Sequence, residues 1–219
     1  MITVRWHGHA CFEIVTSSGL VIVIDPHDGK SLGLKTPQVS ADVVLITHEH
    51  FDHNAYAVVA KPGAKVFSMS VGEKFVDNIK IVGIETYHDK DRGKRRGRNV
   101  LYKVVVDDIS ILHLGDLGHI FNGDLASKLK PIDMVMVPVG GVFTIDGKEA
   151  WKVVEVLDPN IVIPMHYWIQ GLELPLKPVD EFLEQAPKDW NINRVEYNSI
   201  YIDRSTIKPK TVYVLNYSL

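Results

Sequence analysis

The stretch "VVLITHEHFDHN", Val43–Asn54, joins an unbroken apolar segment to a dense group of side chains that can bind metal ions. Consecutive apolar residues at its start are typical of a strand that is covered on both faces of a sheet. The metal-capable residues follow within six positions and are His48, His50, Asp52 and His53. Because side chains alternate along a strand, His48 and His50 are expected to point the same way. A turn into a helix near Asn54 would bring the other two back toward the same point, so the H-x-H-x-D-H pattern predicts a site for zinc, manganese or iron.

A plain cluster of polar turn residues is the alternative interpretation, but it gives no structural purpose to this ending of an apolar strand. One metal needs more than two histidines, so further ligands are expected at the ends of other strands. His88 follows "IKIVGIETY", Asp116 ends "ISILHLGD" and His166 ends "IVIPMH". Taken singly, each of these three residues would be interpreted as a turn residue or a core residue. Their common position, at the carboxyl end of an apolar strand, indicates that they belong to one site.

Composition and length limit the classes of protein that this chain can represent. Its 219 residues, with 46% hydrophobic and 23% charged residues, suit one globular domain spanning 1–219. A formal net charge of −3 gives no general attraction to nucleic acid or to membranes. Cys11 is the single cysteine, which excludes an internal disulfide and a cysteine-based zinc site. No signal peptide and no apolar run of membrane-spanning length is visible, so a cytoplasmic location is expected.

The order of the expected elements predicts an α/β fold. The first half consists of short strands rich in β-branched residues, with a hairpin expected to turn at Asp107–Asp108. The second half alternates strands with two expected helices at 146–157 and 178–186, and strands return at the end. Asp146 and Glu149 have the spacing of a capping box at the start of the first helix. We expect two sheets packed face to face, with helices outside.

At these residues the sequence resembles the metallo-β-lactamase-fold hydrolases. The resemblance rests on "THEHFDH", on His88, on Asp116 within "HLGDLGH" and on His166 within "PMHY". "WHGHACFEI" and "IDP" also resemble the branch that contains ascorbate-6-phosphate lactonase and N-acylphosphatidylethanolamine phospholipase D. The resemblance implies a four-layer αββα sandwich with two metal ions in a cleft at the edge between the sheets. By the family pattern, one ion takes His48, His50 and His88, the other takes Asp52, His53 and His166, and Asp116 bridges them.

Two substitutions separate this chain from other branches of the family that it resembles. Flavodiiron relatives have Glu where His50 stands, which disfavours an oxygen-reducing role. Several antibiotic-hydrolysing relatives have Cys where Asp116 stands, which disfavours the hydrolysis of β-lactams.

The expected activity is metal-dependent hydrolysis. Two divalent ions about 3.5–4 Å apart, most consistent with zinc but compatible with manganese or iron, can hold a bridging hydroxide as the nucleophile. Asp52 is expected to orient this nucleophile and to take its proton. His119, three residues after Asp116, is a candidate to line the cleft as a proton donor or substrate contact.

The sign of the substrate is indicated by the basic run "KDRGKRRGR", Lys90–Arg98, which follows His88 directly. A solvated loop is the usual interpretation of such a run, but its position predicts an anionic ester: a phosphodiester, a phosphorylated small molecule or a lactone. Arg95 and Arg96 are the expected substrate contacts. The amides of Gly140 and Gly141 are further candidates, although the pair can equally serve a tight turn.

Metal-bound imidazoles usually donate their other nitrogen to a carboxylate or carbonyl group. Asp25, at the end of "LVIVID", is the expected acceptor, against the alternative of a plain strand-ending Asp. His9 is expected to lie beside it, or else to be a buried histidine with a structural hydrogen bond. Two other functions remain open at this stage. One is a nuclease acting on RNA or DNA, which the basic run favours, although larger nucleases of the fold that the chain resembles usually carry an extra domain. The other is a binding module that keeps the site without turnover.

Overall fold

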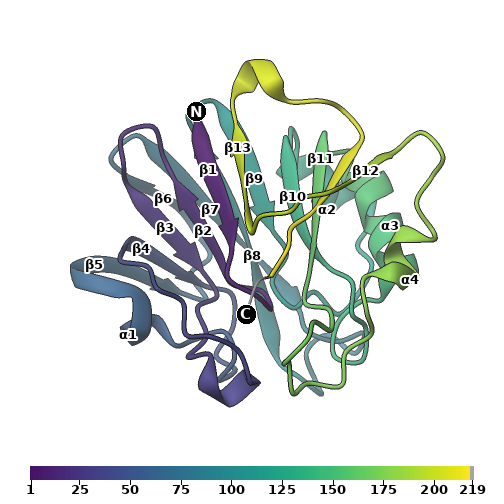
Figure 1. Ribbon diagram of the computed structural model, residues 1–219, viewed down its shortest axis with the longest axis horizontal. Coiled ribbons are helices and arrows are strands. Elements are labelled where there is room, and N and C mark those ends of the chain that lie inside the picture. The colour runs from purple at the N-terminus through teal and green to yellow at the C-terminus, as the bar shows by residue number, and fades with distance from the viewer. Residues whose placement is uncertain (218–219) are drawn as a thin grey trace.

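The computed structural model describes residues 1–217 and contains two mixed β-sheets with helices outside them (Figure 1). The strands of the first sheet are β1 (Ile2–Trp6), β2 (Phe12–Val15), β3 (Val21–Ile24), β4 (Ala41–Ile46), β5 (Ala60–Ser68) and β13 (Ser199–Ile202). Those of the second sheet are β6 (Gly72–Val76), β7 (Ile79–Tyr87), β8 (Arg98–Val106), β9 (Ile109–His113), β10 (Met134–Pro138), β11 (Ile161–Met165), β12 (Asn191–Arg194) and β14 (Thr211–Val214). The helices are α1 (Tyr56–Val59), α2 (Gly123–Leu129), α3 (Gly147–Leu157) and α4 (Asp180–Leu183), with 3-10 turns η1 (Lys30–Leu32) and η2 (Arg204–Thr206). The predicted αββα sandwich is confirmed.

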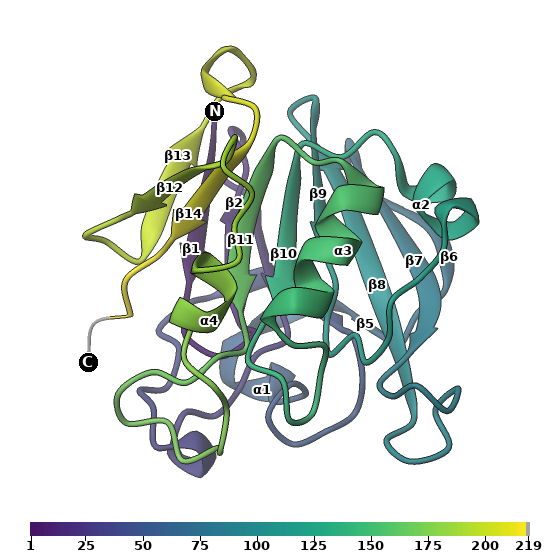
Figure 2. The same cartoon turned by 90° about the vertical axis from the view of Figure 1, so that its right-hand side faces the viewer.

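Strand direction brings the predicted ligands to one edge of the sandwich. The first sheet has the order β13-β1-β2-β3-β4-β5 and the second has the order β12-β14-β11-β10-β9-β8-β7-β6. β9, β10 and β11 are mutually parallel, and β7 runs the same way because two antiparallel pairings reverse the chain twice. β3 and β4 are also parallel neighbours. The loops that follow β4, β7, β9 and β11 therefore gather at one end, the lower end in Figure 2.

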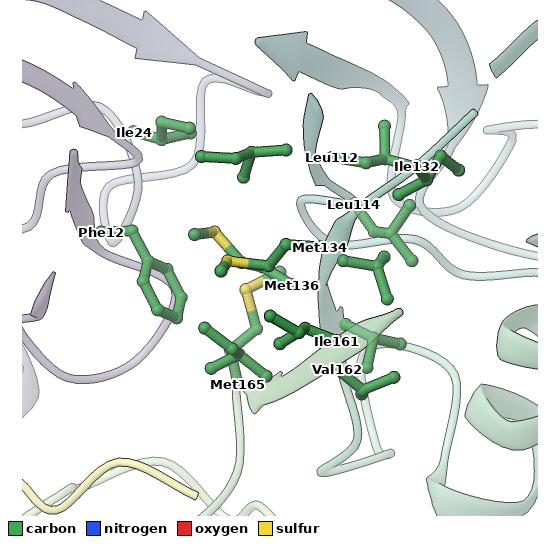
Figure 3. Packing of buried hydrophobic residues seen from close by; sticks show 14 of the residues in the cluster. Phe12, Ile24, Leu112, Leu114, Ile132, Met134, Met136, Ile161, Val162 and Met165 are labelled. Atoms are coloured by element: carbon green, nitrogen blue, oxygen red, sulfur yellow. The ribbon is translucent and has the colours of Figure 1, made fainter. Parts of the chain in front are cut away.

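The core lies between the two sheets and fixes them against each other. Phe12 and Ile24 from the first sheet face Met134, Met136 and Met165 from the second (Figure 3), and all five are fully buried. Burying an apolar side chain of this size stabilises the folded state by about 1.5–3 kcal/mol relative to leaving it exposed. Such close packing gives the loops at the sheet edge a rigid base.

Helix α3 covers the outer face of the second sheet (Figure 2). The predicted capping box is confirmed: Glu149 N donates to Asp146 Oδ1 at 2.9 Å, and Asp146 N donates to Glu149 Oε2 at 3.3 Å. Trp151 on this helix stacks on Phe182 of α4 at 4.6 Å between ring centroids, and its Nε1 donates to Phe182 O at 2.8 Å. These two contacts fix α3 against α4 on the outside of the sandwich.

The second expected helix, at 178–186, is shorter than predicted. The structure has only α4, whose N-cap residue Val179 provides no side-chain hydrogen bond. After Glu184 the backbone bonds tighten to a 3-10 pattern, from Gln185 N to Phe182 O and from Ala186 N to Leu183 O. Within residues 1–217, no helix is long and apolar enough to cross a membrane.

Candidate metal centre

The strand ends bring six of the seven predicted ligands, all but Asp116, into two groups of metal-capable atoms. One group contains His48, His50 and His88, and the other contains His9, Asp52, His53 and His166; within each group the ligand atoms lie within 4.8 Å of one another. His50 is exposed, whereas the other members are buried. His9 belongs to the second group although the sequence predicted it only as a supporting residue.

Asp116 contacts members of both groups. The Nε2 atoms of His88 and His166 each lie 3.1 Å from Asp116 Oδ2, and that of His48 lies 3.7 Å from it. The Nε2 atom of His53 lies 3.3 Å from Oδ1. The structure therefore gathers four imidazole nitrogens around one carboxylate.

These distances fit atoms that share a cation. Ligand nitrogens and oxygens lie about 2.0–2.1 Å from zinc, so two of them at tetrahedral positions are about 3.3 Å apart. The distances from the four imidazole Nε2 atoms to the oxygens of Asp116 lie close to this value, some below it and some above it. His48 Nε2, His53 Nε2 and Asp116 Oδ1 are also buried without a hydrogen-bond partner. Buried polar atoms rarely lack a partner, so the donor set and its geometry fit metal ions.

Asp25 holds two of the histidines in the orientation that directs Nε2 toward the site. Its Oδ2 accepts from His53 Nδ1 at 2.9 Å and from Thr47 Oγ1 at 2.7 Å, while Oδ1 accepts from Thr47 N at 2.8 Å. Since the Thr47 hydroxyl proton goes to Asp25, its oxygen can accept from His48 Nδ1, which is 3.0 Å away. Both Nδ1 atoms then carry the proton and both Nε2 lone pairs face Asp116. Thr47 was not identified from the sequence.

His9 lies against Asp52, not beside Asp25 as expected. Its Nε2 is 2.9 Å from Asp52 Oδ2, and its ring centroid is 4.3 Å from that of His166. Burial and the neighbouring His166 lower the pKa of His9 to about 3, so this imidazole is neutral. Its Nε2–H group donates a hydrogen bond to Asp52. The Asp52 side chain is thereby fixed at the cleft.

Charges in the centre are strongly coupled. Burial alone would raise the pKa of the Asp116 carboxyl, but His166 and His53 hold it well below its usual range. Burial alone would lower the pKa of His53, but the carboxylates of Asp116, Asp52 and Asp25 raise it well above its usual range. These three carboxylates thus concentrate negative charge around the His53 ring, and a bound cation would balance that charge.

Asn99, which the sequence did not indicate, positions the backbone of Asp116. Its Oδ1 accepts from Asp116 N at 3.0 Å, and its Nδ2 donates to Leu114 O at 3.0 Å and to Thr86 Oγ1 at 2.9 Å. The residue is fully buried. A polar residue near the start of a long apolar strand is the only signal in the sequence, and it does not reveal the partner.

Gly118 allows the loop after Asp116 to pack directly on the backbone of His88. A Cβ at this position would lie closer than 3.0 Å to the backbone of His88 and Asp89, a separation that real Cβ atoms essentially never show. Gly118→Ala is therefore expected to destabilise the fold by about 1–3 kcal/mol and to lower metal content, because the backbone of His88 must move. Thermal unfolding and metal analysis of the purified variant measure both effects.

Gly123→Ala is the matched control, since a Cβ at that helical position meets nothing within 4 Å. It is expected to unfold at the wild-type temperature or slightly above it. Equal melting temperatures for the two variants would show that His88 is not held by this contact.

His119 does not reach the cleft. Its Nε2 accepts from Tyr87 N at 3.3 Å and its Nδ1 lies 3.2 Å from Ile120 O, so both ring nitrogens are engaged by backbone groups. Among the described residues, His119 is not one of those that line the cleft beside Asp116. We therefore assign His119 no role in proton transfer.

The Gly140–Gly141 pair supports the turn and does not line the cleft. Gly140 N donates to His166 O at 3.0 Å, and Gly141 adopts φ +61°, which favours glycine. Both residues are buried. The Gly140 amide is thus committed to the backbone of His166, and of the two interpretations the tight turn is the one that the structure favours.

A cleft of about 260 Å³ opens beside Asp116 and is lined by His50, Phe51, Asp52, His88, Arg96, Asp116, Phe143, His166 and Leu174. A larger hollow of about 750 Å³ shares His88, Arg96 and Phe143 with it. Arg95 lines only this outer hollow and pairs with Asp91, Nε to Oδ2, at 2.5 Å. Of the two predicted arginine contacts, the structure brings Arg96 alone to the cleft.

Comparison with known proteins agrees with this geometry. Residues 3–166 match the family model described as beta-lactamase superfamily domain. The sequence is 37% identical over 192 residues to the UPF0173 metal-dependent hydrolase of Thermococcus onnurineus, covering 76% of this chain and 85% of that protein. A protein of the same description from Thermococcus kodakarensis is 34% identical over 194 residues, with the same coverage of 76% and 85%. A solved structure from Thermotoga maritima, assigned to the Zn-dependent hydrolases of the metallo-beta-lactamase superfamily, has a TM-score of 0.78 and 33% identity, and the match covers 98% of this chain and 99% of that one.

Proposed function

We propose that this chain, which belongs to the beta-lactamase superfamily and is a metal-dependent hydrolase, cleaves a small anionic ester with the help of two divalent cations. The observation that carries the proposal is the convergence of four histidine Nε2 atoms on the carboxylate of Asp116. Phosphodiesters, phosphorylated small molecules and lactones are the substrate classes that we consider.

The donor groups suggest how two cations would be held. His48, His50 and His88 would bind one, and Asp52, His53 and His166 would bind the other, with Asp116 shared. Imidazole and carboxylate ligands suit zinc best, and also manganese or iron. Bound there, the cations would lower the pKa of water and polarise the oxygen of the scissile group. With neutral histidines, the two cations and the two ligand carboxylates leave about +2 net charge, which favours an anionic substrate.

Asp52 is the residue that we assign to the nucleophilic water. It lines the cleft while remaining 8% exposed. Burial alone would raise the pKa of its carboxyl, but His53 and His9 hold it well below its usual range, so it stays ionised. The hydrogen bond from His9 Nε2 fixes Oδ2 of Asp52. An ionised carboxylate fixed in this way can orient a water molecule and accept its proton.

Ion pairs within the basic run favour a small substrate over a polynucleotide. Lys90 pairs with Glu149 at 2.5 Å, Arg95 pairs with Asp91 at 2.5 Å, and Arg98 pairs with Glu85 at 3.0 Å. Half of the six cations are thus neutralised locally, which weakens any extended positive surface of the kind that binds a phosphate backbone.

The proposal is tested by loading the protein with zinc, manganese or iron and screening bis(4-nitrophenyl) phosphate, phosphorylated monoesters, small lactones and RNA. Turnover of a small anionic ester is the expected result. Cleavage of RNA alone would instead support a nuclease. Tight binding of these compounds without turnover of any would support a binding module.

Removal of the metal is expected to lower the melting temperature by about 5–10 °C. A ligand present at a hundred times its Kd stabilises the native state by about 2.7 kcal/mol, and in a chain of this size 1 kcal/mol shifts the melting temperature by about 2–4 °C. Thermal unfolding with and without EDTA measures the change, and excess zinc should reverse it. An identical melting temperature in EDTA would contradict a bound structural cation.

A further inference from the structure

The loop that carries the basic run is fixed to the metal centre through Asp89, the neighbour of His88. The Asp89 carboxylate accepts hydrogen bonds of 2.8–3.0 Å from four backbone amides of the loop, those of Asp91, Gly93, Arg95 and Arg96. His88 N donates to Gly97 O at 3.1 Å and closes the loop. The backbone of Arg96 is therefore held in a constant position relative to a predicted metal ligand.

Arg96 differs from the other cations of this loop. It alone among them lines the metal cleft, and within residues 1–217 its guanidinium has neither an ion pair nor a side-chain hydrogen bond. Arg92 and Lys94 also have no ion pair in this part of the chain, but they line neither the cleft nor the outer hollow. Arg96 is thus the cation that a molecule in the cleft would meet.

Phe143 orients this guanidinium. The Arg96 Cζ atom lies 4.7 Å from the centroid of the Phe143 ring, a cation–π contact. Stacking of this kind occupies one face of the planar group and leaves its in-plane N–H donors free. Those donors form a fork that matches the two oxygens of a carboxylate or phosphate. Both residues lie where the cleft and the outer hollow meet.

We propose that Arg96 is the specificity-determining residue, and that it selects substrates carrying a second oxyanion, a carboxylate or a phosphate, outside the group that is cleaved. The proposal rests on the proposed function, because the metal centre must hold the reacting group while Arg96 holds the other. It defines the substrate class as small esters or lactones with two anionic or metal-binding ends, joined by a short body that passes Phe143.

A pair of inert ligands tests this inference without turnover. Both 3-phosphonopropionate and propylphosphonate offer a phosphonate to the cations, but only the first has a carboxylate at its other end. Calorimetric titration of the zinc-loaded protein is expected to show that 3-phosphonopropionate binds about 10-fold to 100-fold more tightly, as charged hydrogen bonds of this kind provide. Arg96→Ala should reduce this preference to near unity.

Arg95→Ala is the matched control, because it removes the same charge from the next position of the loop, where Asp91 already pairs with it. It should keep most of the preference. Arg96→Lys should keep only part of it, since lysine lacks the planar fork. Both Arg96 and Arg95 are exposed, so neither substitution should alter the melting temperature.

The outcomes separate this inference from the proposed function. No preference in the wild type, an equal loss in the Arg95→Ala and Arg96→Ala variants, or a preference that survives Arg96→Ala would each overturn the role of Arg96. In each of these cases, turnover of bis(4-nitrophenyl) phosphate, an anionic ester without a second oxyanion, would leave the proposed function standing. A preference that depends on Arg96, in a protein that hydrolyses none of the screened compounds, would support the anion-binding role and contradict the proposed function.

Discussion

Asp116→Ala is expected to lower kcat/KM by more than about a hundredfold and to reduce bound metal below one equivalent. Asp116 is the group around which the Nε2 atoms of His48, His53, His88 and His166 assemble. Losing a residue that only supports a metal ligand typically costs 10-fold to 100-fold in metal affinity or activity, so losing a ligand common to both groups should cost more. Elemental analysis and steady-state kinetics on the ester found by screening measure the two effects.

Two further variants make this prediction specific. Asp116→Asn keeps one oxygen and the shape of the side chain, and is expected to retain some metal but little activity. Asp124→Ala removes an exposed carboxylate from the first turn of α2 and should match the wild type in both measurements. Full metal content in Asp116→Ala would show that this carboxylate is not a ligand.

Asp25→Ala is expected to lower the free energy of unfolding by about 3–5 kcal/mol, the cost of removing one partner from a buried charged network. The substitution leaves Thr47 N, Thr47 Oγ1 and His53 Nδ1 without their acceptor, in a place that water does not reach. The ring of His53 is then free to rotate, so metal affinity should also fall, by about 10-fold to 100-fold. Urea unfolding and competition with a zinc chelator measure the two quantities.

Asp25→Asn separates charge from conformation, because asparagine tolerates the φ of +51° that Asp25 adopts better than alanine does. Its free energy of unfolding and its metal affinity should lie between those of the wild type and of Asp25→Ala, since the amide of asparagine has only one acceptor oxygen. Asp28→Ala, three residues later, removes a carboxylate whose hydrogen bonds within residues 1–217 are both with Ser31, and should cost about 1 kcal/mol or less. If Asp25→Ala unfolds at the same urea concentration as Asp28→Ala, the network around Asp25 does not support the site.

The elements that carry the site could be located from the sequence because each has a local signal. The consecutive apolar residues of β4, the capping box of α3 and the hairpin turn all depend on neighbours in the chain. Asp107 and Asp108 adopt φ of +49° and +59°, as a two-residue hairpin turn requires. The placement of the seven predicted ligands followed from strand ends, which parallel strands bring to one edge.

Elements without such a signal were not predicted. All four residues of β12, "NINR", are exposed, so the strand has no alternation of apolar and polar positions, and it is defined by pairing with β14. β6 pairs only with β7 and is mostly exposed. Both strands are defined by pairing with a neighbouring strand of the sheet, which supplies the order that local preference does not.

The same distinction applies within the site. Asn99 reaches Asp116 across 17 positions and Thr47 reaches Asp25 across 22, and neither contact follows from spacing in the sequence. The direction of His119 and the burial of the Gly140 amide depend on how the loops pack after their strands end. The convergence of the candidate ligands was therefore predictable from residue type and strand position, whereas the supporting hydrogen bonds required the fold.

Anomalous diffraction from crystals soaked in zinc, measured on both sides of the zinc absorption edge, will show whether the seven side chains hold a pair of cations. We expect two anomalous peaks, one among His48, His50 and His88 and one among Asp52, His53 and His166, with Asp116 next to both. A peak in only one of these two groups would contradict the binding of a pair of cations. The absence of any peak within coordination distance of Asp116 would contradict the metal centre itself.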